Sequence, residues 1–254
     1  MSSFYSRHYW RIGFQSRLYD LLMPEVYADS LRQVVACAPN NIGKLWLDFG
    51  CGSGALIEAL ESRLREGDRY VGSDRLLPGL INAWEKAERR KVASRVGLVQ
   101  SDLTQPFPFA PGVADVIVAH FSLYTIELGR RERALGQFRA LLRPGGTLVV
   151  VEPSPEYDAL RIINESLSRI QERSGVFRSR LKKWLVYPLT YRFGLKFIER
   201  QLKNNSWHAS SGADLCEEVC QAGFEVKHIE PVYAGSAICL WLKKFWGEVK
   251  IFVV

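Results

Sequence analysis

Short hydrophobic runs alternate with longer amphipathic stretches along most of the chain. Nearly continuous apolar runs, as expected of buried strands, lie at residues 45–49, 70–72, 96–100, 114–119 and 147–151. Between the first two runs, Leu56, Leu60 and Leu64 are spaced as on one face of a helix, and a further helix is predicted at 131–142, between the last two runs. Strands that alternate with helices require right-handed crossovers, so the pattern predicts a mostly parallel, doubly wound sheet.

The alternation stops after Glu152 and resumes near Ser211. The segment between them has apolar residues at helical spacing, including Ile163 and Ile170, and no strand pattern. Ser211 is a typical helix N-cap, and the segments 224–229 and 237–242 are predicted as the last two strands. The predicted fold class is therefore α/β: a Rossmann-like, doubly wound, mostly parallel seven-stranded sheet with an N-terminal helical arm and a helical insertion after the fifth strand.

The composition is that of a folded domain, with 254 residues, 47% of them hydrophobic and 24% charged. One α/β domain with an insertion is expected at this length, and its core should be sizeable. We expect an N-terminal helical lid at residues 1–40, a Rossmann-like core at 41–155 and 207–254, and an insertion at 156–206. The sequence indicates no particular oligomeric state.

Targeting signals and metal motifs are not evident in the sequence. No run approaches the ~18 apolar residues of a spanning helix, and residues 1–20 lack the apolar block of a signal peptide. The five cysteines form no C-x-x-C pair, which predicts neither a disulfide framework nor a metal site. We therefore expect a cytoplasmic protein without a bound metal.

The net charge of +7 belongs almost entirely to the insertion. Residues 156–206 contain 11 Lys and Arg against 5 Asp and Glu, whereas the rest of the chain contains 23 against 22. Aromatic residues are also frequent there, among them Trp184, Tyr187 and Phe193. This composition suits a cover over a lipophilic acceptor with an acidic substituent, or a contact with an anionic membrane surface. A solvated helix face is the simpler alternative.

A glycine-rich turn follows the first strand and carries the strongest chemical signal. Gly50, Gly52 and Gly54 lie between that strand and a predicted helix, where backbone N–H groups can approach a ligand closely. Asp74 follows 20 residues after the last glycine, which is the usual position of an acid that binds ribose hydroxyls. The turn and the acid together fit either a nicotinamide cofactor or another adenosine ligand.

Further motifs distinguish the two ligands. In order along the chain they are LDFGCGSG at 47–54, GSD at 72–74, SDL at 101–103 with PFPF at 106–109, ADVIVA at 114–119 and LLRPGGTL at 141–148. With these motifs, residues 40–155 resemble the class I S-adenosylmethionine-dependent methyltransferases, specifically the methyltransferase-11 or UbiE-like small-molecule group. A short-chain dehydrogenase would be expected to have Tyr-x-x-x-Lys, and no tyrosine here is followed by lysine at that spacing.

The resemblance implies a role for each position of the first motif. The three glycines, Gly50, Gly52 and Gly54, would let the methionine part of S-adenosyl-L-methionine lie against the backbone. Asp48 would orient this loop and hold the ammonium group, directly or through water. His120, just after the fourth strand, would offer its carbonyl oxygen to the same amino group.

The resemblance also implies the contacts of the nucleoside part. Asp74 would accept hydrogen bonds from both ribose hydroxyls, and Asp102 would accept from the adenine amino group. Leu103 would offer its backbone N–H to the adenine ring, and Leu76 would pack on its face. Each carboxylate has a structural alternative as a helix cap or turn residue.

Methyl transfer is an in-line displacement on a carbon activated by a sulfonium, so positioning can supply much of the rate. A base is needed only where the acceptor must lose a proton. His120 is a candidate base, in addition to the contact of its carbonyl oxygen with the amino group, and Tyr124 is the stronger candidate for a contact with the acceptor. The aromatic N-terminus, with Tyr5, Trp10 and Tyr19 among its members, resembles the lid of this family.

The acceptor predicted from these features is a lipophilic or aromatic small molecule, methylated at oxygen or carbon. Nucleic acid is disfavoured as a partner, because neither the Asn/Asp-Pro-Pro-Tyr motif of amino methylation nor the Pro-Cys pair of cytosine C5 methylation is present. Two alternatives stay open at this point: an RNA methyltransferase or RNA-binding protein of this fold, supported by the basic insertion, and an inactive methyltransferase-fold binding partner.

Overall fold

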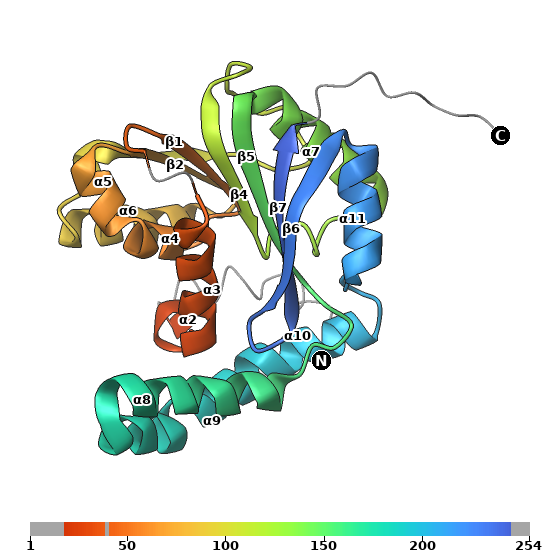
Figure 1. Ribbon diagram of the computed structural model, residues 1–254. Coiled ribbons are helices and arrows are strands. Elements are labelled where there is room, and N and C mark those ends of the chain that lie inside the picture. The colour runs from red at the N-terminus through yellow and green to blue at the C-terminus, as the bar shows by residue number, and fades with distance from the viewer. Residues whose placement is uncertain (1–17, 39–40, 245–254) are drawn as a thin grey trace.

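The computed structural model describes residues 18–38 and 41–244, and its centre is a seven-stranded sheet with the order β3-β2-β1-β4-β5-β7-β6 (Figure 1). The strands are β1 (Leu45–Phe49), β2 (Arg69–Asp74), β3 (Val96–Gln100), β4 (Ala114–His120), β5 (Leu142–Pro153), β6 (Phe224–Val232) and β7 (Ala237–Lys244). Strands β1 to β5 pair in parallel, and β7 is antiparallel to both β5 and β6. The predicted fold class, a mostly parallel seven-stranded Rossmann-like sheet, is confirmed.

Helices pack on both faces of the sheet. They are α2 (Leu18–Leu21), α3 (Glu25–Ala36), α4 (Ala55–Ala59), α5 (Glu61–Glu66), α6 (Leu77–Arg89), η1 (Ala93–Arg95), α7 (Leu128–Leu141), α8 (Ala159–Leu185), α9 (Tyr187–Leu189), η2 (Thr190–Leu195), α10 (Lys196–Lys203) and α11 (Gly212–Gln221). Alternate residues of β4 point to opposite faces, so Val116 and Val118 join the core under α3, α4 and α6, whereas Ile117 joins the core under α7 and α11. The central strands are therefore buried on both sides, as their apolar runs predict.

Two predicted helices differ in detail from those observed. The helical pattern at 56–64 is divided at Leu60 into α4 and α5, although its apolar residues still share one buried face. The predicted helix at 131–142 begins earlier, at Leu128, and Leu142 already belongs to β5. Ser211 does cap α11 as predicted, through a capping box with Asp214.

The segment after β5 forms α8, α9, η2 and α10, which lie beyond the carboxyl ends of the parallel strands (Figure 1). Helix α8 is interrupted at Gly175, whose φ of 83° is left-handed and suits glycine. The Ser179 hydroxyl donates to the Leu167 carbonyl over 3.1 Å, so the chain folds back on itself after this break. No helix within the described ranges is long and apolar enough to span a bilayer.

Candidate active site

The glycine turn after β1 is closely packed against the loop that follows β4. Gly50, Gly52 and Gly54 have φ angles of 79°, 51° and 72°, a region that residues with a side chain rarely adopt. A Cβ atom placed on Gly50 would lie only 2.5 Å from the Cβ of Ser122. Glycine is thus required at position 50 both by backbone conformation and by space.

Asp48, the second-last residue of β1, is a buried carboxyl directly beneath this turn. Its Oδ2 accepts a hydrogen bond of 2.7 Å from the hydroxyl of Tyr70 on β2. Burial raises the pKa of Asp48 to about 7, and the bond from Tyr70 offsets part of that effect. A cation that binds next to Asp48 would favour the ionised form, so this carboxyl is suited to an ammonium group.

Asp74, the last residue of β2, joins the glycine turn to the start of α6. Its Oδ2 accepts from the Gly52 amide over 2.9 Å, and its Oδ1 accepts from the Leu76 amide over 2.8 Å. Burial raises the pKa of Asp74 although both backbone bonds act against the rise. Each carboxylate oxygen has two lone pairs, so each can accept a second bond from a ligand hydroxyl. Leu76 is half-buried at the N-cap position of α6.

Asp102 and Leu103 follow β3 on the next loop. Asp102 Oδ1 accepts from both the amide and the hydroxyl of Thr104, and its Oδ2 lies 3.9 Å from an Arg75 nitrogen. Burial opposes ionisation of Asp102, but the two bonds from Thr104 and the positive charges of Arg75 and Arg130 together lower its pKa. Asp102 therefore does stabilise the turn after β3 through its Oδ1, and its Oδ2 is the oxygen available for a ligand. The Leu103 side chain packs into the core under α7.

His120, the last residue of β4, is buried and uncharged near neutral pH. Its Nε2 is 2.9 Å from the hydroxyl of Ser30 on α3, and Ser30 donates in turn to the Tyr27 carbonyl. Burial lowers the pKa of His120 to about 3. An imidazole with so low a pKa is a poor general base at neutral pH, which favours the alternative in which only its backbone contributes.

Tyr124 belongs to a cluster of aromatic rings beyond the carboxyl ends of β4, β5 and β6. Its ring meets that of Trp207 edge-on, with centroids 5.2 Å apart, and that of Phe121 at 6.4 Å. Phe121 also stacks on Tyr27 at 5.9 Å and contacts Tyr233 at 5.1 Å. Phe121 has a left-handed φ of 52°, which is uncommon for an aromatic residue.

Glu152 on β5 is a site residue that the sequence interpretation did not select. Its side chain is buried, and its Oε1 accepts from the Leu123 amide over 2.9 Å and from the Ser122 amide over 3.3 Å. Burial raises its pKa to about 7, against the attraction of Arg131. Glu152 thus holds the loop that carries His120 and Tyr124. The sequence did contain a signal for this residue, because Glu152 is an acid directly after the apolar run at 147–151.

Two N-terminal residues of the described range also reach the site. The carboxylate of Asp20 on α2 accepts from the Ser53 hydroxyl of the glycine turn over 2.6 Å and from Lys86 of α6 over 3.2 Å. Tyr19 is hydrogen-bonded to Tyr27, and burial raises its pKa. The rest of the predicted aromatic lid lies outside the described residues, namely Tyr5, Tyr9, Trp10 and Phe14.

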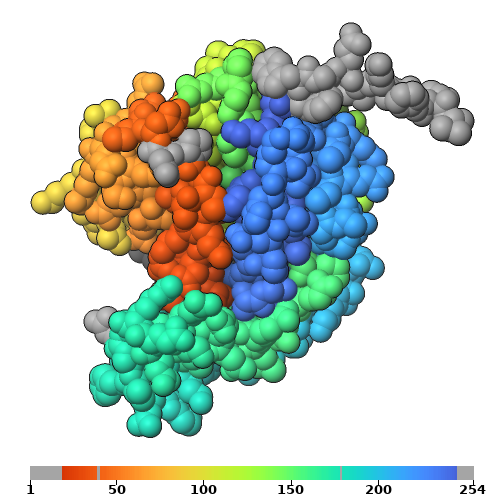
Figure 2. Space-filling view, in the orientation of Figure 1, coloured from red at the N-terminus to blue at the C-terminus, as the bar shows by residue number. Residues whose placement is uncertain are grey.

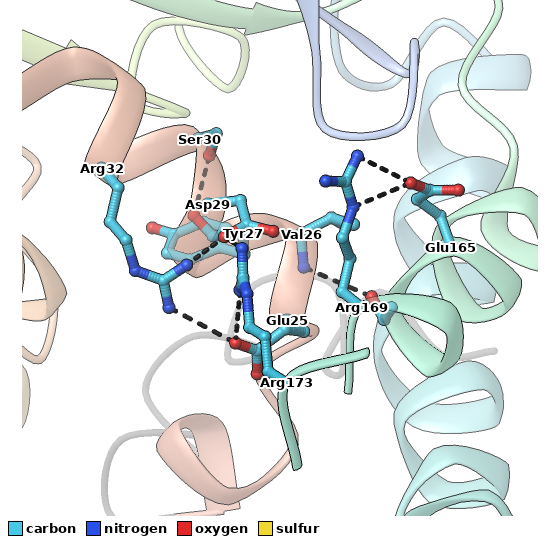
Figure 3. A network of polar contacts seen from close by, with 10 residues as sticks. Glu25, Val26, Tyr27, Asp29, Ser30, Arg32, Glu165, Arg169 and Arg173 are labelled. Carbon is cyan, nitrogen blue, oxygen red and sulfur yellow. Dashed lines mark hydrogen bonds and ion pairs between the residues drawn. The ribbon is translucent and has the colours of Figure 1, made fainter. Parts of the chain in front are cut away.

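The insertion is attached to α3 by ion pairs (Figure 3). Arg173 of α8 binds Glu25 at 3.0 Å and Asp29 at 2.7 Å, while Arg169 pairs with Glu165 on its own helix at 2.9 Å. Beside this network, a cavity of about 460 Å³ lies between α3, α8 and the turn that joins β6 to β7. Its α3 wall includes Val26 and Asp29, and its wall on the β6–β7 turn includes Tyr233, whose ring contacts Tyr27 and Phe121.

Comparison with known proteins places these features in context. Residues 47–150 match the sequence profile of the methyltransferase domain. A demethylmenaquinone methyltransferase from Thermus thermophilus is 35% identical over 133 residues, which cover 52% of this chain and 58% of the relative. The chain spans about half the length of the curated relatives it matches, between 41% and 58%.

Solved structures share the fold at low identity. A SAM-dependent methyltransferase from Aquifex aeolicus has a TM-score of 0.61 at 14% identity, covering 90% of this chain and 97% of that one. An O-methyltransferase family 2 protein from Planctomyces limnophilus, solved with apigenin, has a TM-score of 0.59 at 19% identity and covers 85% and 57%. Identities this low show similarity of fold alone.

Proposed function

Because the chain belongs to the class I S-adenosylmethionine-dependent methyltransferases, we propose that it transfers a methyl group from S-adenosylmethionine to a lipophilic or aromatic small molecule. The family predicted from the sequence is thereby confirmed, and S-adenosylmethionine is the cofactor of that family. One observation carries the proposal for this chain: a glycine turn, in which Gly50 and Gly54 have no room for a side chain, lies between the buried carboxyl of Asp48 and the partly buried carboxyl of Asp74, at the carboxyl ends of adjacent strands.

The residues around the turn fit the cofactor in charge and in shape. Asp48 would bind the ammonium group, since it is buried and gains its charge most easily next to a cation. Asp74 would bind the ribose hydroxyls while its backbone bonds keep the carboxylate in place. Asp102 Oδ2 and the Leu103 amide would bind the adenine edge, and Leu76 would pack on the ring.

The chemistry requires little of the protein beyond binding and orientation. When bound, S-adenosylmethionine supplies a methyl group on a positively charged sulfur, which an acceptor atom can attack in line. The aromatic rings near Phe121 and helix α2 would exclude water from the reacting atoms. Helix α2 is bound to the glycine turn by the hydrogen bond between Asp20 and Ser53. His120 is too weak a base to take a proton at neutral pH, so an acceptor that reacts as an oxyanion or carbanion would have to be ionised by another route.

A greasy or aromatic acceptor is favoured by the rings beyond β4. Tyr27, Phe121, Tyr124, Trp207 and Tyr233 form one contiguous cluster. Flat aromatic molecules bind well in such surroundings, because ring stacking and apolar burial act together. The names of the relatives agree with this acceptor class, since one is a demethylmenaquinone methyltransferase and a structural neighbour was solved with the flavone apigenin. O- or C-methylation is therefore our proposal.

We also propose a role for each of the three parts of the chain. Residues 1–40 would act as a lid and residues 156–206 as an acceptor cover, with the cofactor bound by 41–155 and 207–254. The ion pairs between Arg173 and α3 support this arrangement, because they attach the insertion to the helix that touches His120 (Figure 3). The predicted contact with an anionic membrane surface depends on the insertion alone and is a separate proposal.

The test is methyl transfer from radiolabelled S-adenosylmethionine to a panel of acceptors. We expect label in an organic-extractable hydroquinone or hydroxylated flavone, and much less label with Asp74→Asn at a cofactor concentration close to the Kd of the unaltered chain. An RNA sample belongs in the same panel, because the exposed cations of the insertion favour RNA as the second candidate. Label in RNA and in no small molecule would contradict the acceptor class. Tight cofactor binding without label in any acceptor would favour an inactive binding protein.

A further inference from the structure

The end of the insertion, residues 176–193, is a surface of exposed apolar side chains, and we will call it the insertion tip. In Figure 2 the insertion, coloured teal, stands out from the body of the molecule at the end away from the sheet. Phe177 is 80% exposed, Trp184 76% and Leu185 62%. Val176, Leu181, Leu189 and Phe193 are also exposed there. Large apolar side chains gathered at one site on a surface mark an interaction site.

The apolar residues share one side of the helix after the Gly175 break. Phe177, Leu181 and Trp184 are four and three residues apart, so they project from the same face. Ser179 lies on the opposite face and is buried, with its hydroxyl bonded to Leu167 in the first half of α8. The helix therefore packs on the insertion with its polar side and presents its apolar side outward, the reverse of an ordinary surface helix.

Cations flank this apolar face, and they lack acidic partners. No Asp or Glu occurs between Glu172 and Glu199. Arg180, Lys183 and Arg192 are exposed and make no ion pair or side-chain hydrogen bond within the described residues. Elsewhere in those residues exposed cations commonly do have partners, as Arg173 does with Glu25 and Asp29. The tip is thus a positive and apolar surface whose charges are unpaired.

From this combination we infer that the insertion tip docks the protein on an anionic lipid surface. Phe177, Leu181 and Trp184 would enter the boundary between headgroups and acyl chains. Arg180 and Lys183, which are three residues apart along one edge of this apolar face, would bind the lipid phosphates beside it. Attachment would be peripheral and reversible. This docking is independent of the proposed methyl transfer, because it uses none of the cofactor or aromatic-cluster residues.

A membrane fits the tip better than other partners do. RNA could stack on Phe177 and Trp184 and would satisfy the cations, but it would leave the exposed Leu181, Leu185 and Leu189 in water, since aliphatic side chains give a base nothing to stack on. A second copy of the chain could cover the apolar face, but a symmetric contact would bring the unpaired cations of both copies together. An anionic bilayer satisfies the apolar side chains and the cations at once.

The test is co-sedimentation of the full chain with sucrose-loaded vesicles. Phosphatidylcholine vesicles with 30% phosphatidylglycerol are compared with pure phosphatidylcholine, at 0.1 M and 1 M NaCl. We expect binding to the anionic vesicles at 0.1 M salt, with a large loss at 1 M, where the Debye length falls from ~10 Å to ~3 Å. The double variant Arg180→Ser, Lys183→Ser should bind about 25-fold more weakly, at about five-fold for each cation.

Two further variants make the result specific. Phe177→Ser with Trp184→Ser should weaken binding at least about ten-fold without changing net charge. Arg89→Ser with Arg130→Ser removes two cations of α6 and α7 whose side chains are each 61% exposed, and it should bind as the unaltered chain does. All of these side chains are exposed, so thermal unfolding should stay close to that of the unaltered protein.

Several outcomes would overturn the inference. Absence of binding to anionic vesicles at 0.1 M salt would do so, as would an equal loss in the Arg89 and Arg130 control. Retention of RNA on a filter without vesicle binding would identify a nucleic acid as the partner. A dimer in analytical ultracentrifugation that the Phe177 and Trp184 variant dissociates, again without vesicle binding, would identify a second copy. The proposed methyl transfer is tested separately by the radiolabel assay, so none of these results decides it.

Discussion

Asp74 connects ligand binding and local stability, so replacing it with asparagine tests both at once. The carboxylate accepts from the Gly52 and Leu76 amides over 2.9 and 2.8 Å. Asparagine retains one acceptor oxygen, and its NH₂ group cannot accept from the other amide. A buried N–H that loses its acceptor costs about 1–3 kcal/mol, which corresponds to a fall in Tm of roughly 2–10 °C for a chain of this size.

The same substitution should weaken cofactor binding. Hydrogen bonds to a charged acceptor contribute about 1.5–3 kcal/mol, so loss of the carboxylate charge should raise the Kd for S-adenosylhomocysteine roughly 10- to 100-fold. Calorimetric titration at 25 °C gives the Kd, and scanning fluorimetry gives the Tm of the free protein. The sequence alone predicts only the binding defect, because the bonds to Gly52 and Leu76 appear only in the structure.

Asp68→Asn is the matched control for Asp74→Asn. Asp68 is a fully buried carboxyl at the opposite end of β2, where it accepts from the Lys44 amide, the Trp46 indole and Arg63. Its substitution should lower Tm and leave the Kd unchanged. The reasoning is refuted if folded Asp74→Asn binds S-adenosylhomocysteine as tightly as the unaltered chain, or if Asp68→Asn loses as much affinity.

Three further predictions concern the turn and the two buried titratable groups beside it. Gly50→Ala should lower Tm and abolish cofactor binding, whereas Gly112→Ala, with a similar φ of 68° but no atom within 4 Å of the new Cβ, should show the smaller effect of backbone strain alone. Because burial raises the pKa of Glu152 from 4.5 to about 7, the native state loses stability as the pH rises from about 4.5 to about 7. Glu152→Gln should remove up to about 3 kcal/mol of this pH-dependent loss in the free energy of unfolding. Urea unfolding of the unaltered chain and the variant at pH 5 and pH 8 measures the difference. An equal pH dependence in the two proteins would contradict the prediction. His120, with a pKa of about 3, should stay neutral down to pH 5 in an NMR titration assigned with His120→Asn, and an ordinary imidazole titration near pH 6.5 would show that the ring is accessible.

The sheet and the glycine turn were predictable because their signals are local. A nearly continuous apolar run such as 114–119, interrupted only by Asp115, predicts a strand buried on both faces, and that is how β4 is placed. The Gly50 to Gly54 spacing predicts a tight turn, since glycine adopts the observed positive φ angles with the least strain. The break at Leu60 was not predictable, because the apolar spacing of α4 and α5 is that of one continuous helix.

Contacts between distant segments could not be predicted from one sequence. The bond from His120 to Ser30 joins residues 90 apart, and the bonds from Glu152 to the loop after β4 span about 30 residues. The basic, aromatic character of the insertion was evident in the sequence, but which rings are exposed was not. Tyr187 is buried against the core, whereas Phe177 and Trp184 face outward. Which of these rings is buried depends on how the chain folds back at Gly175.

The claim that matters most is that the glycine turn and its two carboxyls bind S-adenosylmethionine. Calorimetric titration of the unaltered chain with S-adenosylmethionine, S-adenosylhomocysteine and NAD tests this claim without knowledge of the acceptor. We predict micromolar binding of the two sulfur ligands, with one site per chain, and no detectable binding of NAD. Tighter binding of NAD than of either sulfur ligand, or no binding of either by folded protein, would contradict the account.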